Sequence, residues 1–182
     1  MTYALKPLEP PYSAEVEQLL AGYPRRGGYL LTLFRTFANS ARFLRKGVVN
    51  LLDNDSPLPL RLREIVILRV TARLGCVYEW GVHVAAFAAQ AGLSEAQVAA
   101  TRLGGDGEPC WSAEEALTIR VVDELCNRAS LSEATRSAFQ ETWTQAQQLE
   151  ILALCGNYHT VSFVANVAQL EPEPFGARFP AV

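Results

Sequence analysis

Helical periodicity constrains this chain more than any other feature, because nearly every apolar segment repeats at the spacing of an α-helix. We find no convincing run with the strict alternation of apolar and polar residues that is typical of a β-strand. Two capping-box patterns, Ser94 with Gln97 and Ser112 with Glu115, mark expected helix starts. The sequence therefore predicts an all-α fold, and it shows no repeat of the solenoid type.

The expected helices are separated by glycines and polar turns. They cover about 13–22, 29–52 with a break near Asn39–Ser40, 60–74, 76–90, 94–103, 112–129, a short stretch from Ser132, and 144–169. The glycine-rich segment 104–110 is the best candidate boundary between two halves. We expect a single domain over 1–182, with an N-terminal arm and first helix (1–28), a core half (29–103), a second helical half (104–170) and a tail (171–182).

Composition narrows the classes of function. A net charge of -3, with no basic cluster, argues against nucleic acid or an acidic membrane as a partner. The N-terminus lacks the pattern of a signal peptide, and charged residues interrupt every apolar run before it reaches the length of a membrane span. The four cysteines form no CxxC pair and no zinc-ligand spacing, so we expect free thiols, no metal site and a cytoplasmic location.

Residues 76–83 carry the candidate chemistry. Cys76, Glu79 and His83 are spaced i, i+3 and i+7, which places a thiol, a carboxylate and an imidazole on one helical face. These groups suit proton transfer or thiol chemistry. A lone histidine in a helix is more often structural, but Glu79 lies one turn before His83 and can orient it.

Two of the remaining candidates have alternative interpretations. Glu64 lies in an apolar stretch between Arg63 and Arg69, so it is either a surface carboxylate paired with arginine or a buried one folded over the following helix. Cys76 follows Gly75 at a helix start, where the helix dipole lowers the pKa of a thiol. Cysteines at helix starts are common, however, and a buried, unreactive thiol is the default interpretation.

Aromatic and basic residues complete the set of candidates. Tyr78 and Trp80 flank Glu79 and are candidates for substrate binding, although core packing is the commoner role of such residues. His159 either faces the site or packs, and we expect it to pack, as we do its neighbours Asn157 and Tyr158. Four arginines recur on the expected helix at 60–74, and one of them is a candidate to hold a substrate carboxylate, with a solvated helix face as the alternative: Arg61, Arg63, Arg69 and Arg73.

The run LPLRLREIVILRV…YEWGVHVAAFAAQAGLS, strongest over 57–103, resembles the carboxymuconolactone decarboxylase family, which includes the alkyl hydroperoxidase D-like proteins. The resemblance implies an all-α, alkyl hydroperoxidase D-like helical bundle, often built from two related halves. It also implies self-association into trimers or hexamers. Family members of the decarboxylase branch work without a metal or an organic cofactor.

The hydroperoxidase branch of this family carries the pattern Glu…CxxCxxxH. Glu64, Cys76 and His83 match this pattern, but Glu79 stands where the branch has its second cysteine. A carboxylate cannot form a disulfide with Cys76, so turnover by a dithiol pair is not expected. A one-cysteine peroxidase that uses Cys76 and an external thiol stays open.

The decarboxylase branch acts on a carboxylated unsaturated lactone. Loss of carbon dioxide leaves an enolate, which requires oxyanion stabilisation and a proton. The first hypothesis is therefore decarboxylation or proton transfer on a small lactone-type substrate, with His83, Glu79 and Glu64 as the acid and base groups. The alternatives are a peroxidase-like antioxidant activity at Cys76, a non-catalytic oligomeric module, and adventitious metal binding by His83 and Glu79, which are too few ligands without neighbouring subunits.

Overall fold

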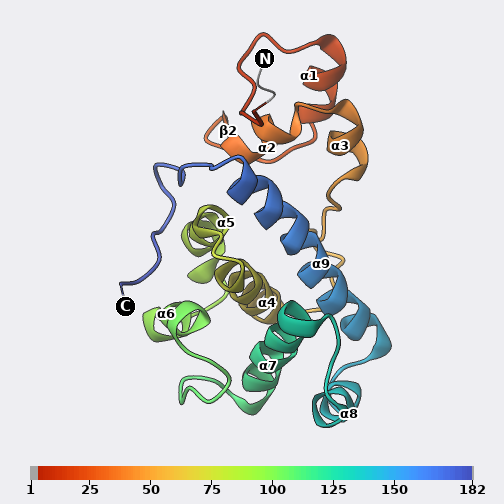
Figure 1. The fold of residues 1–182 in the computed structure, drawn as a ribbon, viewed down its shortest axis with the longest axis vertical. Coiled ribbons are helices and arrows are strands. Elements are labelled where there is room, and N and C mark those ends of the chain that lie inside the picture. Colours follow the sequence, from red (N-terminus) through yellow and green to blue (C-terminus); the bar gives the residue numbers. More distant parts are fainter. Residues whose placement is uncertain (1–3, 182) are drawn as a thin grey trace.

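The computed structural model describes residues 4–181, and within them it confirms the all-α fold class (Figure 1). The helices are α1 (Ala14–Leu20), α2 (Thr32–Phe37), α3 (Ala41–Lys46), α4 (Leu60–Arg73), α5 (Val77–His83), the π-helical turn η1 (Val84–Ala88), α6 (Glu95–Leu103), α7 (Ala113–Arg128), α8 (Glu133–Thr142) and α9 (Gln145–Val167). Both predicted capping boxes form, at the starts of α6 and α7. No helix in the described part of the chain is both long and apolar enough to cross a membrane.

Helix α4 is the centre of the bundle. It contacts α5, α6, α7 and α9, and Figure 1 shows these helices arranged around it. Ile65 and Leu68 face one apolar core, whereas Val66 and Ile67 face the other, and all four side chains are fully buried. Residues 62–72 of α4 are all buried, and a helix that is buried on every side needs neighbours all around it, so α4 positions the rest of the fold.

An N-terminal cap, defined here as residues 14–46, lies at the C-terminal end of α9 (Figure 1). The prediction of one helical region over 29–52 was wrong in part. Its expected break is confirmed, because the Ser40 side chain accepts a hydrogen bond from Phe43 N and starts α3. Tyr29–Leu30 instead forms β2, which pairs with β1 (Arg25–Arg26) across a turn at Gly27 and Gly28, both with positive φ. This hairpin turn places Tyr29 and Leu30 in a strand, and the spacing of apolar residues alone does not reveal such a turn.

The connection between α4 and α5 brings these two helices together. Gly75 has φ +64°, a conformation that glycine adopts without steric cost, and the chain reverses there. The helix predicted over 76–90 is α5 followed by η1, so its second half is a π-helical turn rather than α-helix. π-helical turns occur frequently at functional sites.

The C-terminal tail (171–181) packs along α5. Ala177 N donates a hydrogen bond to Gly81 O at 3.0 Å, and the ring of Phe179 lies 5.2 Å from that of Trp80. A β-carbon on Gly81 would approach Ala177 O to 2.2 Å, which shows how closely the two backbones meet. The tail therefore holds α5 from the side opposite the bundle (Figure 1).

Candidate functional site

A buried ion pair joins α4 to α5. His83 Nδ1 lies 2.7 Å from Glu64 Oε2, and the two residues are 2% and 0% exposed. Because a hydrogen bond with an ionised partner is stronger than a neutral one, this contact fixes the imidazole ring. Of the two interpretations of Glu64, the surface pairing with arginine was wrong, and the carboxylate folded over the next helix is the one observed.

The second imidazole nitrogen faces two further groups. His83 Nε2 lies 3.0 Å from the Tyr158 hydroxyl on α9 and 3.5 Å from Glu79 Oε1 on α5. Phe87, carried by η1, lies against the same imidazole with its ring centroid at 5.2 Å. Elements from three parts of the chain thus meet at His83.

The two carboxylates keep His83 charged. Burial alone lowers the pKa of His83, but Glu64 and Glu79 outweigh it and raise this pKa from 6.5 to about 9. Burial, together with the negative charges of Glu79 and Glu64, raises the pKa of the Tyr158 phenol well above 10. At neutral pH the site therefore holds an imidazolium and a neutral phenol.

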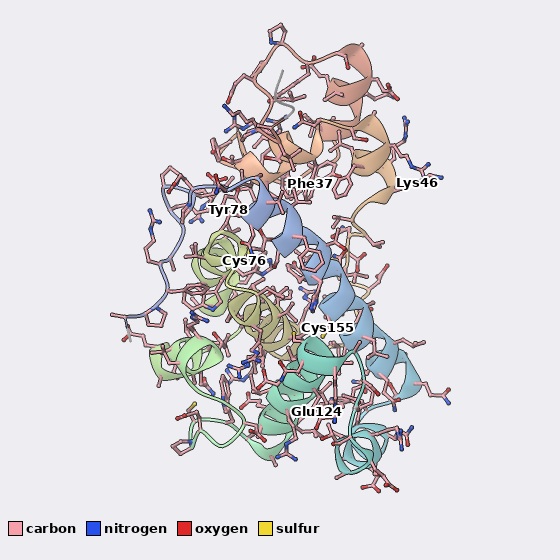
Figure 2. The ribbon with its side chains drawn as sticks, in the orientation of Figure 1. Phe37, Lys46, Cys76, Tyr78, Glu124 and Cys155 are labelled. Atoms are coloured by element: carbon pink, nitrogen blue, oxygen red, sulfur yellow. The ribbon has the colours of Figure 1, made fainter. Side chains whose placement is uncertain are left out.

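A cavity of about 620 Å³ opens beside this group, between the N-terminal cap and the bundle. The bundle contributes Glu79, Phe87, Asn157, Tyr158 and Val161, and the remaining walls come from the cap and from residues 47–52: Gly22, Tyr23, Pro24, Leu33, Phe34, Phe37, Leu44, Val48, Val49, Asn50, Leu51 and Leu52. Figure 2 shows Phe37 at the junction of the cap and α9. The volume of the cavity lies in the range typical of small-molecule binding sites.

Glu79 connects the cavity to the buried histidine. It lines the cavity and is 7% exposed, and its Oε1 faces His83. Its Oε2 has no hydrogen-bond partner among the described residues, and neither has Oε1 of Glu64. A buried carboxylate oxygen of this kind is costly, so it is a ready acceptor for a proton or a donor group from a bound molecule.

Cys76 lies apart from the cavity. It precedes α5 as its N-cap residue, is 0% exposed and belongs to the larger apolar core (Figure 2). Burial raises the pKa of its thiol to about 11, although the nearby N–H of Glu79 and the Ser162 hydroxyl favour the thiolate. The expectation that the helix dipole lowers this pKa was wrong in direction, because desolvation of the thiolate is the larger effect.

Tyr78 and Trp80 point away from the cavity. The Tyr78 hydroxyl accepts a hydrogen bond from Leu33 N and donates one to Glu173, whereas Trp80 Nε1 donates to Thr101 Oγ1 at 3.0 Å. Both rings are buried, and neither is among the residues that line the cavity. The structure places them as packing residues that attach α5 to the cap and to α6.

The four arginines of α4 also have partners within the protein. Arg61 pairs with Glu115, Arg69 forms a two-point ion pair with Asp123, Arg73 bonds Asn127, and Arg63 Nη1 donates to Asp53 O. His159, as expected, packs, with Nδ1 2.8 Å from Cys155 O. Residues 4–181 contain no group of three or more side chains placed to hold a metal ion.

Residues 41–124, which span α3 to most of α7, match the profile of the Carboxymuconolactone decarboxylase family. This segment, which is less than half of the chain, is therefore similar to that family. The predicted resemblance is thereby confirmed, and the carboxymuconolactone decarboxylase segment contains Glu64, Cys76, Glu79 and His83 but ends before Tyr158. No curated protein matched the chain in sequence.

A solved structure supports the same fold. The chain resembles the uncharacterized peroxidase-related protein from Silicibacter sp. TM1040 with a TM-score of 0.78 and 17% sequence identity. The match covers 99% of this chain and 100% of that protein. At this identity the likeness establishes the alkyl hydroperoxidase D-like helical fold.

Sequence reasoning favoured packing for Tyr158 and missed the cap residues as parts of the site. Tyr158 is 75 positions from His83, and no motif links the two. The only signal for Tyr158 is its place on the long final helix, one residue before the second histidine. The walls contributed by residues 22–52 depend on how the cap folds over α9, which helical periodicity does not specify.

Proposed function

We propose that this protein is a general acid–base enzyme that transfers a proton to or from a small molecule in the cavity. The observation that carries the proposal is the position of Glu79. Among the described residues that line the cavity it has the single charged side chain, and it lies against the histidine that Glu64 fixes. A carboxylate at a cavity wall, coupled to a buried imidazolium, is suited to exchange protons with a substrate.

Tyr158 supplies the complementary group. When the imidazolium donates its Nε2–H to the phenol oxygen, the phenol O–H is available to donate into the cavity, which Tyr158 also lines. A neutral phenol backed by a positive charge stabilises an oxyanion. Glu79 and Tyr158 together form a base and an oxyanion donor, the pair that proton abstraction next to a carbonyl requires.

The same pair serves a decarboxylation in the reverse sense of proton movement. Loss of carbon dioxide from a lactone-type substrate leaves an enolate, whose oxygen Tyr158 would hold. Glu79, protonated for this step, would then deliver its proton to carbon and take up another from solvent through the cavity, while His83 keeps its own proton. Decarboxylation and proton transfer are therefore two uses of one arrangement.

The geometry does not favour the alternative at Cys76. A thiol with a pKa of about 11, buried away from the cavity, presents little thiolate to a peroxide. The printed description of the Silicibacter protein as peroxidase-related applies to that protein. We therefore place acid–base chemistry first.

Self-association into trimers or hexamers stays a prediction, as does the cytoplasmic location. Apolar side chains exposed along α9 support self-association: Leu149, Leu152, Phe163 and Val167. An exposed apolar surface of this kind is typical of an interface. Light scattering coupled to size-exclusion chromatography measures the state directly.

The test of the proposed reaction is hydrogen exchange into lactones and ketones in D₂O, followed by NMR, together with carbon dioxide release from carboxylated lactones. Glu79→Gln should slow exchange by about 10²–10⁴-fold, and Tyr158→Phe by about 10²–10³-fold. His159→Gln, which changes the other histidine outside the site, should leave the rate unchanged. Exchange that survives in folded Glu79→Gln would overturn the proposal and favour a non-catalytic role for the buried group.

A further inference from the structure

The polar groups of the cavity are mostly used by the protein itself. Tyr23 donates its hydroxyl to Leu44 O at 2.8 Å, and Asn50 Oδ1 accepts from Leu52 N at 3.1 Å. Both polar atoms of the Asn157 side chain are hydrogen-bonded to Val49: Oδ1 accepts from its N–H, and Nδ2 donates to its carbonyl oxygen. The groups that remain to bind a ligand are Glu79 and Tyr158 next to His83, and the amide nitrogen of the exposed Asn50 at the cap side.

The cavity also lacks a positive charge. No lysine, arginine or histidine is among its described lining residues. Two buried cations lie outside the lining: His83, which is shared by two carboxylates, and Arg63, whose positive charge acts on Tyr158 and whose Nη1 donates a hydrogen bond to Asp53 O. An anion that enters would lose its hydration, meet Glu79 and find no cationic side chain at the cavity wall to bind it.

We infer that the cavity takes an uncharged, mainly apolar molecule with one carbonyl-type oxygen, and that it discriminates against carboxylates. The apolar walls of the cap and of α9 bind the body of the molecule, while Tyr158 donates to its oxygen. Glu79 then lies beside the carbon next to the carbonyl. This inference rests on the proposed function for the roles of these two residues. It specifies the substrate class as neutral ketones, esters or lactones, so of the two proposed reactions it selects proton transfer and counts against decarboxylation of a carboxylate.

A matched pair of probes tests the inference: 2-octanone and octanoate, which have the same number of carbons and differ in charge at neutral pH. Titration followed by ligand-observed NMR gives both dissociation constants. We expect 2-octanone to bind at least about tenfold more tightly than octanoate, which corresponds to about 1.4 kcal/mol. When the pH is lowered until octanoate is protonated, the dissociation constants of the two probes for the unaltered protein should become more similar.

Two variants locate the effect. Glu79→Gln removes the negative charge and should strengthen octanoate binding while it changes 2-octanone binding little. Leu51→Trp, on a segment without regular secondary structure, fills part of the cavity and should weaken 2-octanone binding. The pH series needs no variant, so the test stands even if Glu79→Gln does not fold.

Octanoate binding as tight as that of 2-octanone would overturn the inference, and so would failure of both probes to bind. Neither result depends on catalysis, so hydrogen exchange can still succeed on a substrate of another class. Conversely, preferential binding of 2-octanone without any exchange on ketones or lactones would leave the ligand class in place and count against the proposed function.

Discussion

The pH dependence of folding gives the sharpest test of the buried ion pair. The pKa of His83 rises from 6.5 to about 9 in the folded protein, because Glu64 and Glu79 outweigh the effect of burial. A histidine with a raised folded pKa stabilises the protein fully below its unfolded pKa and loses that contribution as the pH rises through the folded value. The difference between the two values corresponds to about 3 kcal/mol.

The expected result is a free energy of unfolding that falls by about 2–3 kcal/mol between about pH 6 and pH 9. Urea unfolding followed by circular dichroism measures it at each pH. His83→Gln should lose this dependence, and His159→Gln should retain it, which provides a matched control because the chain has 2 histidines. The cysteine thiols begin to titrate near the upper end of this range. Their effect on the free energy of unfolding cancels when each variant is compared with the unaltered protein at the same pH.

The opposite sign would refute the reasoning. A histidine buried in its neutral form makes a protein more stable as the pH rises through about 6.5, because its pKa is then lowered by burial. The same slope in His83→Gln and in the unaltered protein would also contradict it. If His83→Gln does not fold, direct NMR titration of the two imidazoles in the unaltered protein, with His159→Gln used for assignment, answers the question.

Three other predictions follow from packing and burial. Gly81→Ala should lower the free energy of unfolding by about 1–3 kcal/mol, because the added carbon meets the tail at Ala177 O, whereas Gly156→Ala on the exposed face of α9 should raise it by about 0.5–1 kcal/mol. Thermal melts compare the two variants. Cys76 should stay reduced after treatment with an organic hydroperoxide, since its thiol is buried, and intact mass with peptide mapping checks this; rapid oxidation would revive the peroxidase alternative. Tyr158→Phe should destabilise the fold by about 1–2 kcal/mol through loss of the contact to His83, and urea unfolding measures the change.

Local signals predicted local structure well. The capping boxes at Ser94 and Ser112 began helices as expected, because cap and helix lie within a few residues of each other. The proximity of Glu79 to His83 followed from helical spacing alone. The contact between Glu64 and His83 required the turn at Gly75, which the sequence shows as a break without giving its angle.

Long-range contacts were beyond such signals. Tyr158 reaches His83 only because α9 packs on both α4 and α5, and the sequence does not say which face of a helix meets which neighbour. Cys76 shows the same limit in its energetics. Its place at a helix start was read correctly, but the depth of burial that reverses the pKa shift comes from the tertiary core.

The position of the cavity also bears on the dynamics of the protein. The N-terminal cap meets the bundle across the space in which a ligand would lie, so a bound apolar molecule would contact both and act as part of their interface. The cap should then open as a local unit of low stability when the cavity is empty, and opening would be the route by which a ligand enters. Amide hydrogen exchange in α2 and α3 should therefore slow on ligand binding, while exchange in α4 stays the same. A ligand in the cavity would thus couple the unfolding of the N-terminal cap to that of the bundle.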